Sequence, residues 1–512
     1  MTASDLRGAP VLVVGAGIMG AGIAQVAAQA GHSVRLFDTR EGAAARAKTK
    51  IAGALDTLVA KGRLDAGEAA RAMARIEPIA TLEAAAGAQL VVEAIVENLE
   101  AKRTLFRTVE PIVADQAVLA SNTSSISITA IANGLQRPQR LVGMHFFNPV
   151  PLMKLVEVVS GLQTDCDVAQ AVFELSRSWG KVPVHAKSTP GFIVNRIARP
   201  YYAETLALLQ ERAAAPQVLD ACLKAAGFRM GPCELMDLIG LDTNFAVTNT
   251  VYEATFYDKR YVPSLIQREL VDGGLLGRKS GRGFYSYPEG LPPLPVAVYD
   301  APTTAGAVTV HGDGAIADLI ERRTHDALAP QGWGPARSRE SGWTGLDVDG
   351  ARLVLTDGRS ASTVAATVGV ADVAVFDRLL QLPAPNGAAL ACAMAEQAGE
   401  AWRRQATAWL AALGFAPQPL ADTPGLVVAR TVAMLINEAA DAVQQDVCTE
   451  AGADTAMKLG VNYPAGPFEW LEHWGAFEVV QLLDHLDAHY RGERYRVSQE
   501  LRRRVWRPAR RA

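Results

Sequence analysis

A histidine and a glutamate, close together in the sequence, carry the groups needed to move a proton. His145 lies in GMHFFNPVP at the end of a predicted strand, and Glu157 follows twelve residues later in KLVEVV. Oxidation of an alcohol requires a base, and the unperturbed pKa of histidine, ~6.5, suits that task. A carboxylate beside the imidazole would fix its tautomer. The spacing allows one strand to fold back beside the other, although a lone histidine is more often structural.

Two other segments carry polar groups that could bind a substrate oxygen. SNTSS, at residues 121–125, follows another predicted strand, and its hydroxyl and amide groups could contact both substrate and cofactor. Ser124 or Ser125 is also a good N-cap for the helix predicted in ISITAIA. Asn195 lies on a helix after TPG, and its amide can donate to a developing ketone oxygen without titrating. A solvent-facing asparagine is the alternative, and the spacing alone favours it.

A glycine-rich turn near the N-terminus has the spacing of a dinucleotide-binding fingerprint. Gly15, Gly17 and Gly20 follow the strand VLVV and open a helix. In such a turn the first glycine permits the tight bend, the second admits the pyrophosphate and the third allows close helix packing. Asp38 ends the next strand, where a carboxylate binds the ribose hydroxyls and repels a 2′-phosphate. The pattern predicts NAD, and the nearby Arg40 keeps NADP as an alternative.

The elements that would position these residues alternate between strand and helix over the first 185 or so residues, which indicates a parallel sheet with crossover helices. Long helical stretches are predicted around residues 41–62 and 99–113, and helices again from 189 to about 272. A turn-rich segment then marks a domain boundary. The predicted strands are residues 11–14, 33–37, 89–94, 117–121, 140–147 and 154–159.

The helical segment is repeated later in the chain. The stretch that starts at Ser188 is echoed from Asp422, with an offset of 234 that places Ala429 where the first copy has Asn195. This pattern indicates a duplicated helical domain whose second copy is a non-catalytic scaffold. Strand-like runs between the copies, at 295–300, 307–312, 351–357 and 373–379, indicate a smaller α/β unit, interpreted as a degenerate relative of the first domain.

These patterns predict an α/β protein with four parts. The predicted parts are a Rossmann-type dinucleotide-binding domain at 1–187, an all-helical domain at 188–290, a degenerate α/β domain at 291–415 and a second helical repeat at 416–512.

Composition narrows the class of protein. The net charge of -4 gives no reason to expect nucleic acid as a partner. Five scattered cysteines without a C-x-x-C pair indicate neither a metal site nor a disulfide framework, so we expect a reducing, cytoplasmic compartment. The apolar run from Val11 to Gly31 contains two glutamines and several glycines, and we interpret it as strand, turn and helix rather than as a membrane span.

In combination, several segments resemble the 3-hydroxyacyl-CoA dehydrogenase family. The resemblance implies that His145 is the general base, that Glu157 is its partner, and that Ser124 and Asn195 complete the catalytic site. It also implies an NAD-binding set of Gly15, Gly17, Gly20 and Asp38, with further cofactor contacts from Glu97, Lys102, Asn122, Asn148 and Lys279. The matching segments are VGAGIMGAGIAQVAAQAG, VVEAIVENLEAK, SNTSSISIT, GMHFFNPVPLMKLVEVV, STPGFIVNRI and GRKSGRGFY.

The resemblance implies NAD-dependent oxidation of (S)-3-hydroxyacyl-CoA to 3-oxoacyl-CoA, with a CoA thioester as substrate and no metal. Lys50 and Lys61 are both candidates for contacting CoA. The long layout resembles the 3-hydroxyadipyl-CoA dehydrogenases of phenylacetate catabolism. A 3-hydroxybutyryl-CoA dehydrogenase, a general fatty-acid β-oxidation dehydrogenase and a non-catalytic NAD-binding scaffold are the alternatives. Short family members dimerise through their helical domains, so we expect a homodimer, or a pseudo-dimer formed by the two repeats.

Overall fold

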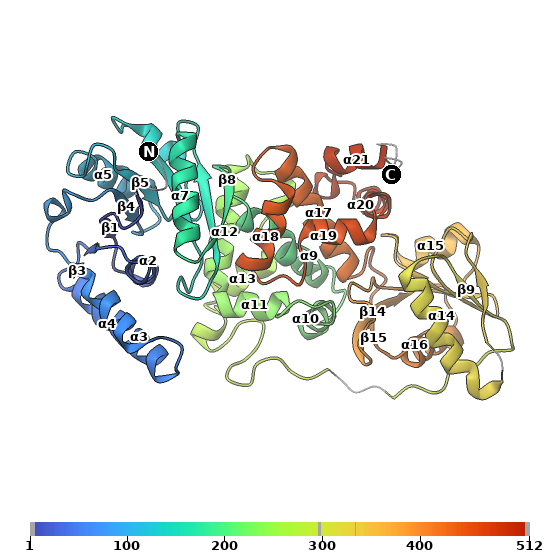
Figure 1. The fold of residues 1–512 in the computed structure, drawn as a ribbon. Helices are drawn as coiled ribbons and strands as arrows, with labels where there is room; N and C mark the ends of the chain where they lie inside the picture. The colour runs from blue at the N-terminus through green and yellow to red at the C-terminus, as the bar shows by residue number, and fades with distance from the viewer. Residues whose placement is uncertain (1–5, 295–297, 333, 507–512) are drawn as a thin grey trace, which may run out of the picture. The chain divides into compact units, whose positions relative to one another are not determined.

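The computed structural model describes residues 6–294, 298–332 and 334–506, which fold into two compact units (Figure 1). The first unit runs to Arg196 and also includes Ala442–Val461. The second unit comprises Ile197–Asp441 and the chain from Asn462 onward. A segment of the second helical repeat therefore belongs to the same unit as the glycine-rich turn.

The first unit is built on an eight-stranded sheet with the strand order β3-β2-β1-β4-β5-β6-β7-β8. All neighbouring strands are parallel except β6 and β7, which are antiparallel. The strands are β1 (Val11–Val14), β2 (Val34–Phe37), β3 (Ile76–Pro78), β4 (Leu90–Glu93), β5 (Val118–Ser121), β6 (Leu141–Phe146), β7 (Leu155–Ser160) and β8 (Val182–Lys187). The helices are α2 (Ile18–Gln29), α3 (Ala43–Ala60), α4 (Ala66–Ala74), α5 (Leu99–Val109), α6 (Ile128–Ala132), α7 (Cys166–Ser178) and α18 (Glu450–Gly460).

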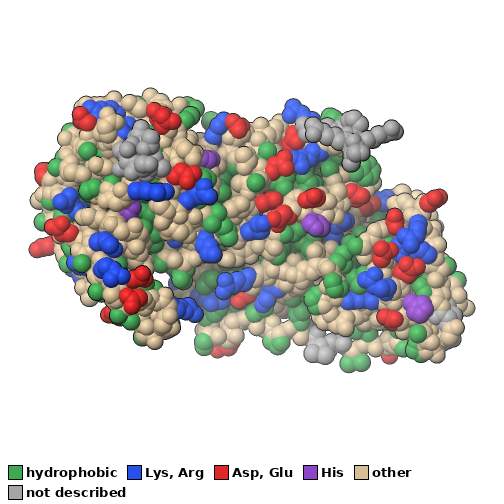
Figure 2. Space-filling view, in the orientation of Figure 1, with side chains coloured by type: hydrophobic (Ala, Val, Ile, Leu, Met, Phe, Trp, Pro, Cys, Tyr) green, Lys and Arg blue, Asp and Glu red, His purple; other side chains and the backbone are tan. Residues whose placement is uncertain are grey.

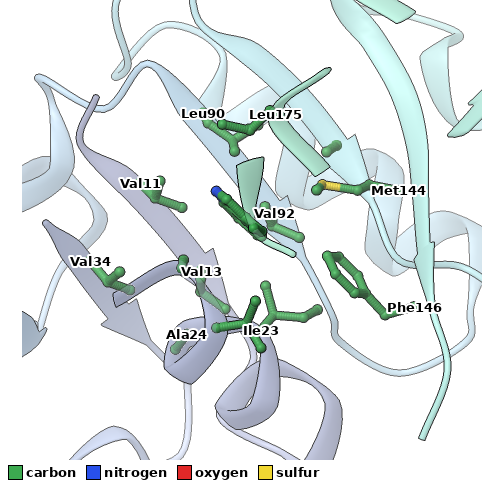
Figure 3. Packing of buried hydrophobic residues seen from close by; sticks show 14 of the residues in the cluster. Val11, Val13, Ile23, Ala24, Val34, Leu90, Val92, Met144, Phe146 and Leu175 are labelled. Carbon is green, nitrogen blue, oxygen red and sulfur yellow. The ribbon is translucent and has the colours of Figure 1, made fainter. Parts of the chain in front are cut away.

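The core of this unit fixes which way the strand residues point. Val13 and Val92 pack with Ile23 of α2, and Met144 and Phe146 of β6 join the same cluster (Figure 3). Because successive side chains of a strand point to opposite faces, the residue between the last two points away from this core. That residue is His145.

The second unit combines helices with a seven-stranded sheet of order β10-β9-β11-β12-β13-β14-β15. Its strands are β9 (Val308–His311), β10 (Ala336–Ser338), β11 (Gly345–Val348), β12 (Ala351–Leu355), β13 (Val373–Phe376), β14 (Ala388–Met394) and β15 (Phe415–Leu420). Its helices are α9 (Arg199–Gln210), α10 (Pro216–Ala225), α11 (Pro232–Ile239), α12 (Leu241–Ala254), α13 (Leu265–Asp272), α14 (Ala315–Leu328), α15 (Ala361–Val368), α16 (Glu400–Ala412), α19 (Pro467–Trp474), α20 (Ala476–Tyr490) and α21 (Gln499–Trp506). The chain passes between the units three times: within α8 (Val194–Ile197), within α17 (Val428–Gln444) and after Val461, just beyond α18.

The three later strand-like runs of the middle segment form β9, β12 and β13. The run predicted at 295–300 forms no strand at 298–300, and residues 295–297 lie outside the described residues.

The two helical repeats pack on each other in one chain through reciprocal contacts. Glu204 accepts hydrogen bonds from the Nε of Arg494 and from the hydroxyl of Tyr495, each at 2.9 Å. Glu438 accepts hydrogen bonds from the Nη1 of Arg260 at 3.3 Å and from the hydroxyl of Tyr261 at 2.5 Å. Both pairs of partners are related by the same offset of 234, and both glutamates are 0% exposed. The repeats therefore meet as the two halves of an isologous interface do.

The described residues contain neither a membrane-spanning helix nor a cluster of metal-ligating side chains. None of their helices combines the length and apolarity needed to cross a membrane. They also hold no group of three or more His, Cys, Asp and Glu side chains that could bind a metal ion. On the face shown in Figure 2, Lys and Arg side chains are interspersed with Asp and Glu.

Candidate active site

The turn between β1 and α2 has the shape needed to bind a dinucleotide. Gly15 has φ +102°, and a Cβ on Gly15 or Gly20 would collide with a backbone carbonyl oxygen. A Cβ on Gly17 would meet nothing within 4 Å, so this glycine leaves open the space that a pyrophosphate requires. Gly17 is also the N-cap of α2 and no side chain caps the helix there. The helix N-terminus therefore offers N–H groups to an anion.

Asp38 lies against this turn at the end of β2. Its carboxylate accepts hydrogen bonds from the backbone N–H of Ala16 at 2.8 Å and from the Nε of Arg40 at 3.1 Å. Burial opposes ionisation, but these bonds outweigh it and lower the pKa of Asp38 to about 2. Asp38 is thus an ionised acceptor suited to ribose hydroxyls, and it engages the guanidinium of Arg40. That engagement fits NAD better than NADP.

The structure brings His145 and Glu157 together. They face each other in the antiparallel register of β6 and β7, with Nδ1 of the imidazole 2.5 Å from Oε2 of the carboxylate. His145 is 6% exposed and Glu157 is 0% exposed. Because a carboxylate only accepts, this contact assigns the Nδ1–H tautomer and leaves Nε2 able to take a proton.

Glu157 is itself held by the start of α8. Its Oε1 accepts hydrogen bonds from the backbone N–H groups of Ile193 and Val194, at 3.1 and 2.9 Å. Both carboxylate oxygens are therefore used, one for the imidazole and one for the helix. Sequence reasoning missed the two N–H donors; the signal for them is the Pro-Gly step before α8, where Gly191 has φ +76°.

The loop after β5 joins Ser124 and Asn195 to Glu97. The Nδ2 of Asn195 donates to the carbonyl oxygen of Ser124 at 3.4 Å, and the N–H of Ser124 donates to Glu97 at 2.9 Å. Ser125 also donates to Glu97, through its hydroxyl, at 3.0 Å. The prediction that Ser124 or Ser125 caps the next helix is wrong, because Ser127 is the N-cap of α6.

Two further residues predicted to bind the cofactor, Lys102 and Asn122, make contacts within the protein. Lys102 is 1% exposed and contacts Glu93 at 2.6 Å and Glu97 at 3.2 Å. Although burial opposes it, the charge of Lys102 and hydrogen bonds from the loop lower the pKa of Glu97. Asn122 accepts from the N–H of Phe146 at 2.9 Å, which ties β5 to β6.

Three lysines and an asparagine complete the predicted set. Asn148 is exposed after β6, and Lys50 and Lys61 are exposed on α3 and at its end. Lys279 lies in the second unit, where its ammonium pairs with Asp242.

Comparison with known proteins identifies the family. Residues 10–189 match the model of the 3-hydroxyacyl-CoA dehydrogenase NAD binding domain. Residues 191–287 and 425–508 both match the C-terminal domain of the same family. The chain belongs to the 3-hydroxyacyl-CoA dehydrogenase family. Residues 353–424 match the reduced Rossmann-fold domain of 3-hydroxybutyryl-CoA dehydrogenase, so both halves of the chain carry elements of 3-hydroxyacyl-CoA dehydrogenases.

Relatives of two lengths are known among these 3-hydroxyacyl-CoA dehydrogenases. The 3-hydroxyadipyl-CoA dehydrogenase of Escherichia coli K12 is 43% identical over 496 residues, 97% of each chain. A crystal structure of 3-hydroxybutyryl-CoA dehydrogenase from Escherichia coli K12 superposes with a TM-score of 0.86 at 42% identity, covering 98% of this chain and 99% of that one. A probable 3-hydroxybutyryl-CoA dehydrogenase of Deinococcus radiodurans is 46% identical over 277 residues, 54% of this chain and 99% of its own. The chain is thus an NAD-dependent oxidoreductase that acts on the CH–OH group of 3-hydroxyacyl-CoA.

Proposed function

We propose that this dehydrogenase oxidises (S)-3-hydroxyadipyl-CoA and that His145 is its base. The observation that carries the proposed chemistry is the 2.5 Å contact between the imidazole and Glu157, both of them buried. The substrate is supported by the relative named 3-hydroxyadipyl-CoA dehydrogenase, which shares the whole long layout with this chain.

In the proposed reaction, Nε2 of His145 takes the proton of the 3-hydroxyl group. Glu157 holds Nδ1–H and stabilises the imidazolium that forms, as a carboxylate does for a catalytic histidine elsewhere. Ser124 and Asn195, which are linked at 3.4 Å, donate to the substrate oxygen as it becomes a ketone. Bound NAD supplies the acceptor for the hydride.

The cofactor set is proposed around the β1–α2 turn. Gly17 leaves the space for the pyrophosphate, and Asp38 accepts from the ribose. Glu97, Asn122 and Asn148 lie on the loops that follow β4, β5 and β6, at the carboxyl ends of those strands, where ligands of doubly wound sheets bind. The buried Lys102 positions Glu97 through the 3.2 Å ion pair.

Location and assembly are also proposed. All five cysteines are free, and four are buried, which supports a reducing cytoplasmic compartment. The reciprocal glutamate contacts within one chain support a pseudo-dimer formed by the two helical repeats.

NADH formation from a panel of CoA thioesters tests the proposal. We expect kcat/KM to be higher with 3-hydroxyadipyl-CoA than with 3-hydroxybutyryl-CoA, the substrate named for the solved relative, and than with longer 3-hydroxyacyl-CoA. His145→Gln should lower kcat by at least ~10²-fold while NAD binding is kept, given the usual contribution of a general base. His185→Gln, at an exposed position of β8, is the control. Near-normal turnover by His145→Gln would remove the imidazole from the mechanism.

A further inference from the structure

The first helical repeat has a cavity where the second repeat has side chains. The cavity has a volume of about 80 Å³, and every residue that lines it belongs to the second unit. Ala203 and Ala207 of α9 form part of its wall. At the offset of 234 that relates the repeats, their counterparts on α17 are Asn437 and Asp441. In an isologous arrangement each contact should occur twice, so these alanines mark a contact that one copy has and the other lacks.

In the second repeat, the two side chains complete a polar network. Asp441 accepts a hydrogen bond from Nη1 of Arg260 and forms an ion pair with it. The amide of Asn437 donates to the carbonyl oxygen of Arg496 at 3.0 Å and accepts from the N–H of Ser498 at 2.7 Å. Nη2 of Arg260 donates to the same carbonyl oxygen at 2.6 Å. A carboxylate therefore neutralises the guanidinium in this copy.

The counterparts of these partners line the cavity. Arg494 takes the place of Arg260, and Ser264 takes the place of Ser498. Nε of Arg494 donates to Glu204 at 2.9 Å, but its Nη2 is buried and has no hydrogen-bond partner among the residues that the structure describes. A buried donor without an acceptor costs free energy, and more so on a charged group. The cavity thus presents an unsatisfied cationic donor where the other copy supplies a carboxylate.

The wall of the cavity is also polar where its counterpart is apolar. Arg199 and Tyr202 line the cavity, whereas Ala433 and Ile436, both 0% exposed, hold the corresponding positions of the second repeat. Arg199 is 5% exposed, and its Nη1 donates to the hydroxyl of Thr248 at 3.1 Å. The first repeat therefore adds a buried cation to a place that has lost an acidic side chain, and an anion there would offset both changes.

We propose that this cavity binds a small free aliphatic carboxylate, which takes the place of the side chain of Asp441. The planar fork of a guanidinium pairs with both oxygens of a carboxylate, which favours this anion over chloride. The volume of about 80 Å³ exceeds the roughly 10–15 Å³ that one water molecule needs and leaves room for acetate or propionate. Because Arg494 comes from the second repeat and the α9 wall from the first, the ligand stabilises the contact between the repeats. No step of the proposed oxidation uses it.

Acetate, with acetamide and chloride as matched probes, tests the site in the native full-length protein. The readouts are the thermal unfolding midpoint at constant ionic strength and the NMR saturation transfer from the protein to the methyl protons of acetate. We expect acetate to raise the midpoint by about 2 °C or more, in a saturable manner, because a ligand that binds only the folded state stabilises it. Acetamide, which has the shape of acetate without its charge, and chloride should cause no such rise. Equal midpoints in acetate and chloride, without saturation transfer, overturn the proposal.

Ala207→Asp lets the protein supply the carboxylate itself, as Asp441 does in the second repeat. It should raise the midpoint in the absence of acetate relative to Ala207→Asn, its uncharged isostere, and should abolish both responses to acetate. Ala254→Asp adds the same charge at an exposed position of α12 and should keep both responses. Responses that persist in Ala207→Asp show that acetate binds elsewhere, and the assignment is then wrong.

A second variant covers the case in which Ala207→Asp fails to fold. Arg494→Lys keeps the positive charge and removes the unsatisfied Nη2, and a lysine does not reproduce the bidentate fork. We expect it to weaken acetate binding by at least ~10-fold, the size expected for loss of a charge-assisted hydrogen bond. An unchanged dissociation constant for acetate in Arg494→Lys contradicts the proposed contact.

Discussion

Replacing Glu157 by glutamine tests the geometry of the proposed base directly, because the native carboxylate accepts hydrogen bonds on both sides. Oε1 accepts from the N–H groups of Ile193 and Val194, and Oε2 faces Nδ1 of His145. A glutamine has one acceptor oxygen and one NH2 group in these places. The NH2 group of the glutamine must therefore face either the helix N–H groups or the N–H of the imidazole, and both of these are donors.

The orientation that keeps the helix contacts satisfied places the NH2 group against the imidazole. Nδ1 of His145 then has to accept, and the ring proton moves to Nε2, the nitrogen that would otherwise take the substrate proton. Loss of a general base costs about 10²- to 10⁴-fold in rate. That factor corresponds to roughly 3–5 kcal/mol of the activation barrier, at about 1.4 kcal/mol per decade. We expect Glu157→Gln to fall in this range with little change in NAD affinity.

Steady-state kcat, NAD affinity and the pH profile of kcat are the measurements. Glu68→Gln, at an exposed position in the first turn of α4, is the matched control and should retain native turnover. Native kcat and an unchanged pH profile in Glu157→Gln would show that the tautomer of the imidazole does not depend on this carboxylate, and the reasoning from the dyad would fail.

Other substitutions test the cofactor turn, the support from the second repeat and an ion pair of the second unit. Asp38→Ser removes the acceptor that engages Arg40 and should raise kcat/KM for NADP relative to NAD by at least ~10-fold, measured with both cofactors; an unchanged ratio contradicts the assigned contact. A Cβ on Gly460 would lie 2.8 Å from a methyl group of β7. Gly460→Val should therefore lower the free energy of unfolding by about 1–3 kcal/mol and reduce kcat. Native values of both quantities would show that the packing of α18 against β7 does not support the proposed site. The hydrogen bond with Asp357 raises the pKa of His485, so its stabilisation is complete below pH ~6.5 and is lost as pH rises through the raised pKa. His485→Gln should flatten that part of the urea midpoint-against-pH curve, and an unaltered slope would exclude this pair as its source.

The strands of the dinucleotide domain could be predicted because their signals are local. Apolar runs bounded by turns mark β1, β2, β4, β5, β6 and β7 at nearly their observed bounds. The edge strands β3 and β8 were not predicted. β8 contains Pro183, and a proline argues against a strand when only the sequence is known. β8 nevertheless lies at the edge of the sheet, where the missing N–H of a proline is tolerated. A position at the edge of a sheet is a property of the tertiary structure.

The sequence indicated which residues to propose for the site, but it did not indicate the contacts that hold them. The spacing of His145 and Glu157 allowed their pairing, since an antiparallel pair needs only a short reversal between strands. The N-cap of α6 was misassigned because Glu97, which lies 27 residues before Ser124, takes the N–H and hydroxyl groups of the loop. Local sequence favours Ser124 as a cap. An acceptor that is distant in the sequence overrides that preference, and a local pattern around Ser124 does not contain it.

The second half retains one contact of the proposed site but lacks the counterpart of Asn195. Asp377 accepts from the N–H groups of Val427 and Val428, the counterparts of the two that Glu157 binds, and Ala429 replaces the asparagine. The neighbouring strand β14, AALACAM, offers no imidazole.

What maintains this half is the burial of charge in the helical repeats. Glu204 is 0% exposed and its partners Arg430 and Arg494 both come from the second repeat. Removing the partners of a buried charge costs about 3–5 kcal/mol, a large part of the stability of a domain. Because each repeat supplies the cations for the other's glutamate, substitutions that remove these cations from one repeat leave a buried carboxylate of the other unpaired. The second repeat, which lacks a counterpart of Asn195, therefore contributes to the stability of the first repeat.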